Sequence, residues 1–169
     1  MSADGEIMRL GNISEDRVRH LLALYDLTLA TVPASQDIPG SFWGDCEAGL
    51  IGATVYARPD TPVHSILHEA CHLMVMPAHR RATVHTDATD SVAEEDAACY
   101  LQLLLSDCIP GFGFDRACRD MDHWGYSFRL GSAKAWFRQD AEDALAFLRE
   151  QALFPLPAPV RALQLGLEA

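Results

Sequence analysis

Apolar residues recur at helical spacing in the first part of the chain. From Val18 to Leu29 they lie mostly three or four positions apart, and Ser14 just before them is a typical helix cap. The pattern predicts an amphipathic helix from residue 14 to about residue 30, which Pro33 ends. From there to residue 60, glycines and prolines separate short apolar segments, and this predicts a β-hairpin or a short antiparallel sheet.

The rest of the chain has mainly helical patterns. Thr61 and Pro62 are typical of a helix start, and Ser91 can cap a later helix whose apolar stripe ends before Pro110. The proline-rich residues 154–159 cannot continue a helix and are expected to be extended. The predicted helices span residues 61–76, 91–109 and 132–153, with a polar connector over 78–90 and an irregular aromatic segment over 111–131.

The order of these elements and the length of the chain predict one α+β domain. The chain has 169 residues, which is enough for one well-developed core and too few for two. We expect a single domain over residues 1–157 and a short C-terminal tail over residues 158–169. A small antiparallel sheet should pack with the helices.

Charge and cysteine content narrow the possible partners and environments. The chain has 24 acidic and 13 basic residues, a net charge of −11, and Lys134 is its only lysine. Such a surface repels phosphate backbones and anionic lipids, so we expect neither nucleic acid nor a membrane as a partner. The N-terminus lacks the pattern of a secretory signal, and the five cysteines form no Cys-x-x-Cys pair, which favours reduced thiols and a cytoplasmic location.

The segment His68-Glu69-Ala70-Cys71-His72 carries the clearest chemistry in the chain. Histidines four positions apart on a helix project from one face, so His68 and His72 can hold one metal ion, for which zinc is the expected choice. Glu69 is then placed to take a proton from a metal-bound water, as a general base does in hydrolysis. Apolar residues flank the motif, and buried histidines and a carboxylate would be costly without a partner.

A third protein ligand must come from another part of the chain, and Glu94 is the preferred candidate. It shares a helix face with Ala98 and Leu101, whereas Glu95 falls on the polar side of the same helix and is the second choice. The alternative for Glu94 is a capping box, in which its side chain would bond back to the Ser91 amide.

Together these residues resemble a known family. His68 to His72, followed by Glu94-Glu95-Asp96-Ala97-Ala98-Cys99-Tyr100-Leu101, looks like the gluzincin arrangement, and the second segment is similar to the Glu-x-Glu-Ala-Asn-x-Phe-Ala stretch of ImmA/IrrE-type metallopeptidases. The resemblance covers about forty residues and implies a zincin-like fold. It also implies that Glu94 completes a zinc site with His68 and His72.

A second resemblance points to a different third ligand. In SprT-like metalloproteins a third histidine follows at the spacing that separates His68 from His85. His85 is therefore an alternative to Glu94 and Glu95, although this chain has neither a Cys-x-x-Cys zinc ribbon nor a basic character.

The segment from Asp120 to Phe128 is the richest polar and aromatic cluster outside the motif. Zinc hydrolases commonly use a His or Tyr donor to stabilise the oxyanion, so His123 and Tyr126 are candidates for that role. The alternative is that these side chains only pack under the loop. His64 lies one turn before His68, and we expect it to be a surface or core residue and not a ligand.

The predicted function is peptide-bond hydrolysis by a zinc metallopeptidase whose substrate is a peptide or protein. By resemblance to zincins, residues 50–56 could supply the sheet edge on which the substrate backbone lies. The rival hypothesis is a zinc-stabilised regulatory or interaction module that does not turn over substrate.

Overall fold

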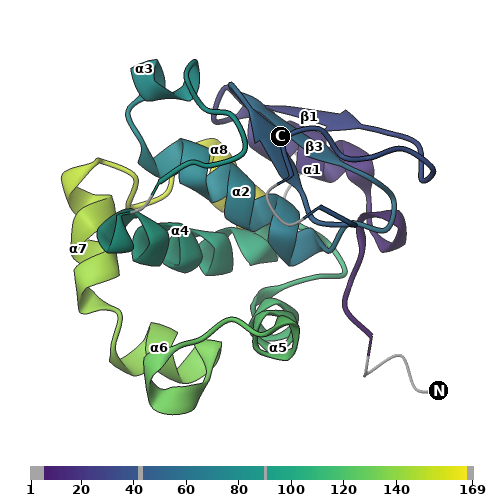
Figure 1. Cartoon of the computed structure of the whole chain (residues 1–169). Helices are drawn as coiled ribbons and strands as arrows, with labels where there is room; N and C mark the ends of the chain where they lie inside the picture. The colour runs from purple at the N-terminus through teal and green to yellow at the C-terminus, as the bar shows by residue number, and fades with distance from the viewer. Residues whose placement is uncertain (1–5, 42–43, 90, 167–169) are drawn as a thin grey trace.

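The computed structural model describes residues 6–41, 44–89 and 91–166 and has an α+β architecture (Figure 1). The elements are, in chain order, η2 (Leu10–Asn12), α1 (Glu15–Ala23), β1 (Thr28–Thr31), β2 (Gly49–Ile51), β3 (Thr54–Ala57), α2 (Val63–Val75), α3 (Ala78–Arg81), α4 (Val92–Leu105), η3 (Ser106–Cys108), α5 (Phe114–Trp124), η4 (Arg129–Gly131), α6 (Ala133–Gln139), α7 (Glu142–Glu150) and α8 (Ala158–Gln164).

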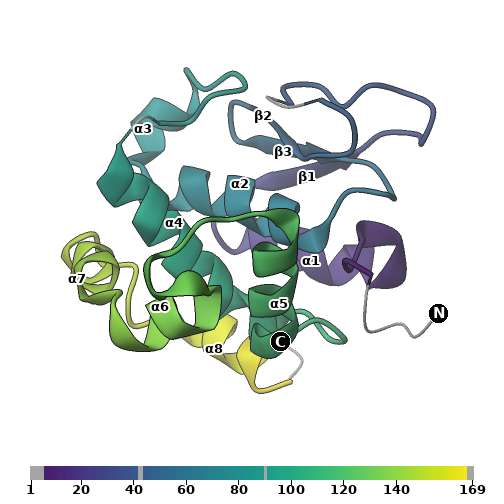
Figure 2. The same cartoon turned by 60° about the horizontal axis from the view of Figure 1, so that its bottom comes forward.

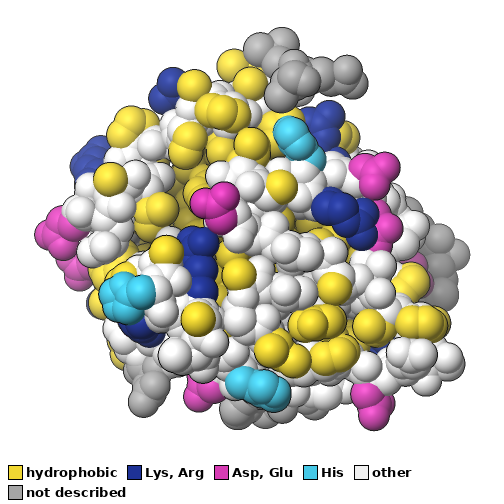
Figure 3. Space-filling view, turned by 90° about the horizontal axis from the view of Figure 1, so that it is seen from above, with side chains coloured by type: hydrophobic (Ala, Val, Ile, Leu, Met, Phe, Trp, Pro, Cys, Tyr) yellow, Lys and Arg dark blue, Asp and Glu magenta, His cyan; other side chains and the backbone are white. Residues whose placement is uncertain are grey.

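The sheet has the strand order β1-β3-β2 and is mixed. β1 runs parallel to β3, and β2 runs antiparallel to it. Alternate residues such as Leu29 and Val55 are buried, and α1 and α2 cover that face of the sheet (Figures 1 and 2). Seen from above the view of Figure 1, the surface carries apolar and charged side chains intermixed (Figure 3).

The outer edge of β2 is already hydrogen-bonded to other parts of the chain. The Leu50 amide donates to the Gly40 carbonyl at 3.1 Å, and the Leu50 carbonyl accepts from the Thr86 amide at 2.9 Å. Gly49 permits this contact, because a Cβ atom there would lie 1.9 Å from the Pro39 carbonyl oxygen. The backbone of β2 therefore has no free groups at Leu50 for an added strand.

Helix α4 lies at the centre of the helical part of the molecule. It packs against α2 on one side and against α7 on another, while α2 itself lies between α4 and the sheet (Figures 1 and 2). Leu101, Leu103 and Leu105 of α4 are fully buried, and so are Ile66 and Leu67 of α2. The α2–α4 contact thus brings two apolar helices together at the core, and the motif lies on one of them.

The predicted helices over 61–76 and 91–109 are confirmed in position, since they correspond to α2 and to α4 with η3. The Ser91 hydroxyl accepts from the Glu94 amide at 3.3 Å, as a helix cap does. The first predicted helix ends earlier than expected, at Ala23. Asp26 has φ = 60°, which breaks the helix and lets Thr28 begin a strand.

Four other expectations differ from the structure. The sheet is mixed and not antiparallel, because it includes β1, which runs parallel to β3. β1 was not expected, since it lies at the end of the segment predicted to be helical. The segment over 111–131 contains α5, and the helix over 132–153 is divided into α6 and α7 at Asp140. Residues 158–164, expected to be part of a tail, form α8, whose Val160 and Leu163 are buried.

Among the described residues, none of the helices has both the length and the apolar character to cross a membrane.

The packing of α8 predicts that this helix is part of the folded domain. Leu163 is 2% exposed and Leu165 is 77% exposed, so the same substitution tests both environments. We expect Leu163→Ala to lower the free energy of unfolding by about 2–4 kcal/mol, because it opens a cavity, and Leu165→Ala to change it by less than about 0.5 kcal/mol. Urea unfolding followed by circular dichroism measures both. Equal stability of the two variants would contradict an integral α8.

Candidate metal centre

A cavity of about 570 Å³ opens beside the motif on α2. Its walls come from the segment just before β2, from α2, from the start of α4, from the segment between α3 and α4, and from the end of α5 with the loop after it. The lining residues are Glu47, Ala48, His64, Ser65, His68, Glu69, His72, Thr86, Asp87, Ala88, Thr89, Glu95, Trp124, Gly125 and Tyr126. Both motif histidines and the motif glutamate thus face the same space.

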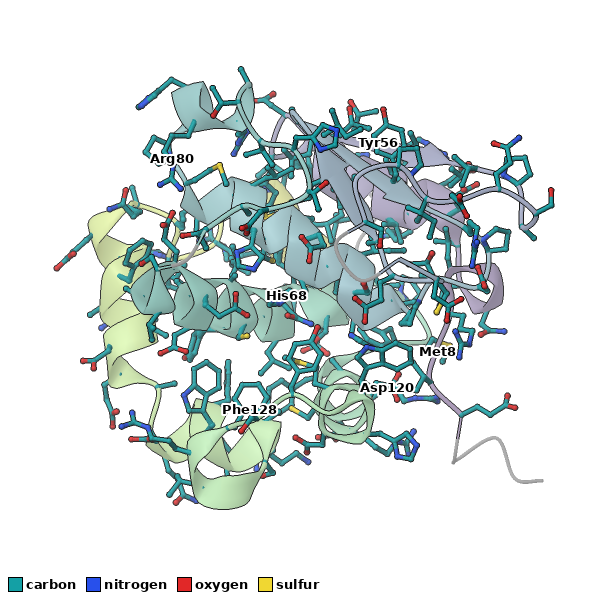
Figure 4. All side chains as sticks on the ribbon, viewed as in Figure 1. Met8, Tyr56, His68, Arg80, Asp120 and Phe128 are labelled. Atoms are coloured by element: carbon teal, nitrogen blue, oxygen red, sulfur yellow. The ribbon has the colours of Figure 1, made fainter. Side chains whose placement is uncertain are left out.

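The two histidines of the motif project from one face of α2, as their spacing predicted. Their Nε2 atoms lie 3.1 Å apart and their rings are perpendicular, with centroids 4.6 Å apart. His68 lies where α2 faces α4 (Figure 4). His72 is 6% exposed, so both imidazoles are held in a confined environment in which converging nitrogen atoms need a proton or a cation between them.

The carboxylate that meets these histidines belongs to Glu95. Its Oε1 atom lies 3.0 Å from His68 Nε2, and its Oε2 atom lies 2.8 Å from His72 Nε2. These hydrogen bonds outweigh the effect of burial and hold the pKa of Glu95 well below its ordinary value. His68, His72 and Glu95 are the group of side chains in the described residues that could hold a metal ion.

The spacing of the two histidine nitrogens and the Glu95 carboxylate oxygens fits a small ion with tetrahedral coordination. A zinc ion bound at about 2.0–2.1 Å places its ligand atoms roughly 3.3–3.4 Å apart. The observed separations of 2.8–3.1 Å are only a few tenths of an ångström shorter. Two imidazoles and one carboxylate are also a ligand set found in catalytic zinc sites, which keep a fourth position open.

Gln102 of α4 fixes the orientation of His68. Its Nε2 atom can only donate to the backbone carbonyl of His64, at 3.0 Å, so its Oε1 atom faces His68 Nδ1 at 2.9 Å. An amide oxygen accepts, so His68 carries a proton on Nδ1, and its Nε2 atom, which donates to Glu95 in the metal-free protein, is the nitrogen left to bind a metal ion. Gln102 is fully buried, which leaves its amide no alternative partners in water.

The structure does not place Glu94, the predicted third ligand, against the histidines. Its Oε1 atom pairs with Arg80 at 2.9 Å, and its Oε2 atom accepts from the Thr89 hydroxyl at 2.7 Å. The capping-box alternative holds only in part: the Ser91 hydroxyl caps the helix, but the Glu94 side chain does not return to the Ser91 amide, which donates to Thr89. Glu94 secures the connector between α3 and α4.

The structure brings Glu95, and not the expected Glu94, to the histidines because α4 is covered on more than one side. Glu94 is indeed the more buried carboxylate, with 12% of its side chain exposed against 46% for Glu95. Glu95 begins a second stripe that continues through Cys99 and Gln102, and this polar stripe faces α2. Its first residue, Glu95, is half exposed at the cavity, whereas Cys99 and Gln102 are buried. The more exposed of the two carboxylates is therefore the one that meets the histidines.

Glu69 lies on α2 between the two histidines and lines the cavity. Burial raises its pKa, and the neighbouring histidines oppose that shift. Its carboxylate takes part in none of the ion pairs or hydrogen bonds among the described residues, so both of its oxygens are available to a ligand in the cavity. These are the properties that a general base requires.

Tyr126 reaches the cavity and His123 does not. The Tyr126 hydroxyl lies 3.2 Å from His64 Nδ1, and its ring meets His68 edge to face with centroids 5.4 Å apart. His123 is exposed on the opposite side of α5, beside Lys134 and Cys118. Successive side chains of α5 point in different directions, so Trp124 and the loop after it face α2 while His123 does not.

The His85 alternative is also not supported by the geometry. His85 is exposed, and its Nδ1 atom contacts the hydroxyl of the adjacent Thr86 at 2.9 Å. Its backbone pairs with Ile51 and turns back at Asp87, which places the segment beside β2. His85 therefore positions the connector that lines the cavity, and its ring is not one of the three converging side chains.

Sequence reasoning missed Gln102, Glu47 and Trp124 as residues of the site. Gln102 lies seven positions after Glu95, two helical turns along the same face, and this spacing was available in the sequence.

His64 was expected to be a surface or core residue. It is fully buried, and its Nδ1 contacts Tyr126 while its Nε2 has no hydrogen-bond partner among the described residues.

The double contact of Gln102 predicts a stability cost when its amide is removed. In metal-free protein, Gln102→Leu leaves the buried His68 Nδ1 without its oxygen acceptor and removes the second hydrogen bond to the His64 carbonyl, and should lower the free energy of unfolding by about 1–3 kcal/mol. Gln151→Leu is the matched control, because Gln151 is exposed and should change stability by less than about 0.5 kcal/mol. Denaturant unfolding in the presence of a chelator compares the two. Wild-type stability of Gln102→Leu would contradict the assigned contacts.

Comparison of the chain with known proteins identifies no family for it. No protein-family model matches the chain, and no curated protein and no solved structure matches it at a significant level.

Proposed function

We propose that this protein is a zinc-dependent metallopeptidase with a zincin-like site. The observation that carries the proposal is the convergence of His68, His72 and Glu95 on one point of a cavity that Glu69 also lines. Helix α2 supplies two ligands and the base, and α4 supplies the third ligand, which is the division of residues that a gluzincin needs. The fold class is consistent with this, since a small sheet packs on the motif helix.

Zinc suits these ligands better than the other common divalent cations. Two neutral imidazoles and one carboxylate are a poor cage for magnesium or calcium, which prefer oxygen ligands in larger numbers. Gln102 holds His68 in the tautomer that leaves Nε2 free for the metal. When bound, zinc supplies a Lewis acid that polarises a carbonyl and makes water easier to deprotonate.

Glu69 is the proposed general base. Its carboxylate takes the proton of the attacking water at an oxygen that faces the cavity, and returns it to the leaving amine when the C–N bond breaks. Because burial raises the pKa of Glu69, the protonated form between these two transfers is more accessible than in water. The peptide bond is thereby replaced by a carboxylic acid and an amine.

Tyr126 is the proposed donor to the developing oxyanion. Its hydroxyl lies in the cavity wall beside His68, and His64 holds it from the other side at 3.2 Å. The hydroxyl is thus fixed before substrate binds, as electrostatic preorganisation requires. His123 has no part in this proposal, because it lies outside the cavity.

The proposed substrate is a peptide or protein, but it does not extend the sheet at β2. Gly40 and Thr86 already occupy the backbone groups of Leu50 on that edge, which argues against the expected use of residues 50–56 as a substrate edge. The segment from Thr86 to Thr89 lies along the cavity instead. A substrate chain would therefore enter between this segment and the loop that carries Tyr126.

Zinc content of ligand variants tests the site. We expect Glu95→Gln to weaken zinc binding by about 100-fold or more, because it removes a charged ligand, and Glu94→Gln and His85→Ala to stay within about threefold of wild type. Zinc retained after equilibration with a competing chelator, measured by atomic absorption, reports all three. A loss confined to Glu94→Gln or His85→Ala would refute the assignment of Glu95.

Turnover is tested with a library of internally quenched peptides. The zinc-loaded wild type should cleave members of the library, and Glu69→Gln should lower kcat/KM by about 10²–10⁴-fold, because the base is lost. Zinc content must be equal in both proteins, so that the loss is assigned to proton transfer. Cleavage by neither protein, with zinc bound in both, would favour the catalytically silent zinc-stabilised module.

A further inference from the structure

Carboxylates dominate the charge of the cavity. Glu47, Glu69, Asp87 and Glu95 line it, and the lining residues that the structure describes include neither Lys nor Arg. None of the ion pairs among the described residues involves Glu47, Glu69 or Asp87. One zinc ion contributes two positive charges against these four carboxylates, which leaves about two negative charges uncompensated.

Glu47 has the geometry of a cation subsite. Its Oε1 atom accepts from the Trp124 indole N–H at 2.9 Å, a neutral donor that fixes the carboxylate without cancelling its charge. The Trp124 ring lines the same cavity, so a carboxylate and an indole are available together. This pair is suited to an ammonium or guanidinium group, which gains an ionic contact and a cation–π contact at once.

A second feature of the same wall points to a ligand. His64 is fully buried and lines the cavity, and its ring centroid lies 5.3 Å from that of Trp124. Its Nε2 atom has no hydrogen-bond partner among the described residues. A buried polar atom without a partner is costly, and a ligand N–H group at this wall would lower that cost.

We propose that the cavity selects substrates with a positive charge beside the scissile bond, either a Lys or Arg side chain or a free α-amino group, held by Glu47 and Trp124. This proposal rests on the proposed function, because it assigns the cation subsite to the same zinc-containing cavity. Asp87 on the opposite segment adds to the negative potential. The net charge of −11 acts in the same direction, since it attracts cationic peptides and repels anionic ones.

Zinc-anchored probes test the charge preference without requiring turnover. Two probes are compared first: the hydroxamates of Nα-acetyl-lysine and of N-acetyl-norleucine. They present the same metal-binding group and side chains of similar length, and they differ mainly in the terminal ammonium of the lysine side chain. Norleucine hydroxamate with a free α-amino group forms the third arm, which separates the two sources of charge. Isothermal titration calorimetry with the zinc-loaded full chain, together with its zinc content, gives the affinities.

At least one of the two cationic probes, the lysine hydroxamate or the norleucine hydroxamate with a free α-amino group, should bind about tenfold more tightly than N-acetyl-norleucine hydroxamate at low salt. The difference in affinity should shrink at high salt. Glu47→Gln should reduce the preference to less than about threefold, because only the carboxylate charge is removed. Asp45→Asn is the matched control: Asp45 is an exposed carboxylate two positions away and does not line the cavity, so the preference should persist.

The outcomes separate this proposal from the proposed function. Equal affinities of all three probes for a zinc-loaded protein would refute the cation subsite and leave the metallopeptidase proposal intact. A preference that survives Glu47→Gln would also refute it. Absence of bound zinc, with no binding of any hydroxamate, would refute both proposals together.

Discussion

The packing of α2 against α4 is the constraint on which the candidate site depends. Apolar residues of both helices form the contact, and a single polar stripe on α4 crosses it. Through that stripe Gln102 fixes His68 and Glu95 meets both histidines. Neither helix could hold the arrangement alone, because α2 provides no acidic ligand and α4 provides no imidazole. The apolar contact determines the register in which the polar atoms meet.

The motif on α2 was predictable and its partner on α4 was not. His68, Glu69 and His72 are close in sequence, so helical periodicity alone places them on one face of α2. Choosing between Glu94 and Glu95 required knowing which side of α4 faces α2. An amphipathic pattern assumes one buried face, and α4 is covered by α2 and α7 together. Tertiary packing therefore decided a question that local pattern could not.

The same distinction explains the success and failure of the fold prediction. Helices with local start signals, such as Pro62 before α2 and the Ser91 cap of α4, were found in place, because such signals do not depend on tertiary packing. The strand β1 continues the apolar spacing of α1, and only the positive φ of Asp26 separates them. α8 follows prolines and is short, and it is stable because Leu163 packs into the core.

The negative charge of the cavity links its two proposed ligands. A site with four carboxylates and no Lys or Arg in its described lining attracts a divalent cation first, and the proposed zinc at His68, His72 and Glu95 would neutralise only part of that charge. Glu47 and Asp87 line the cavity but are not among the three converging side chains. Because Glu47 is fixed by an uncharged indole N–H, its charge would not be cancelled by the proposed metal. The feature that favours the metal therefore also favours a positively charged substrate.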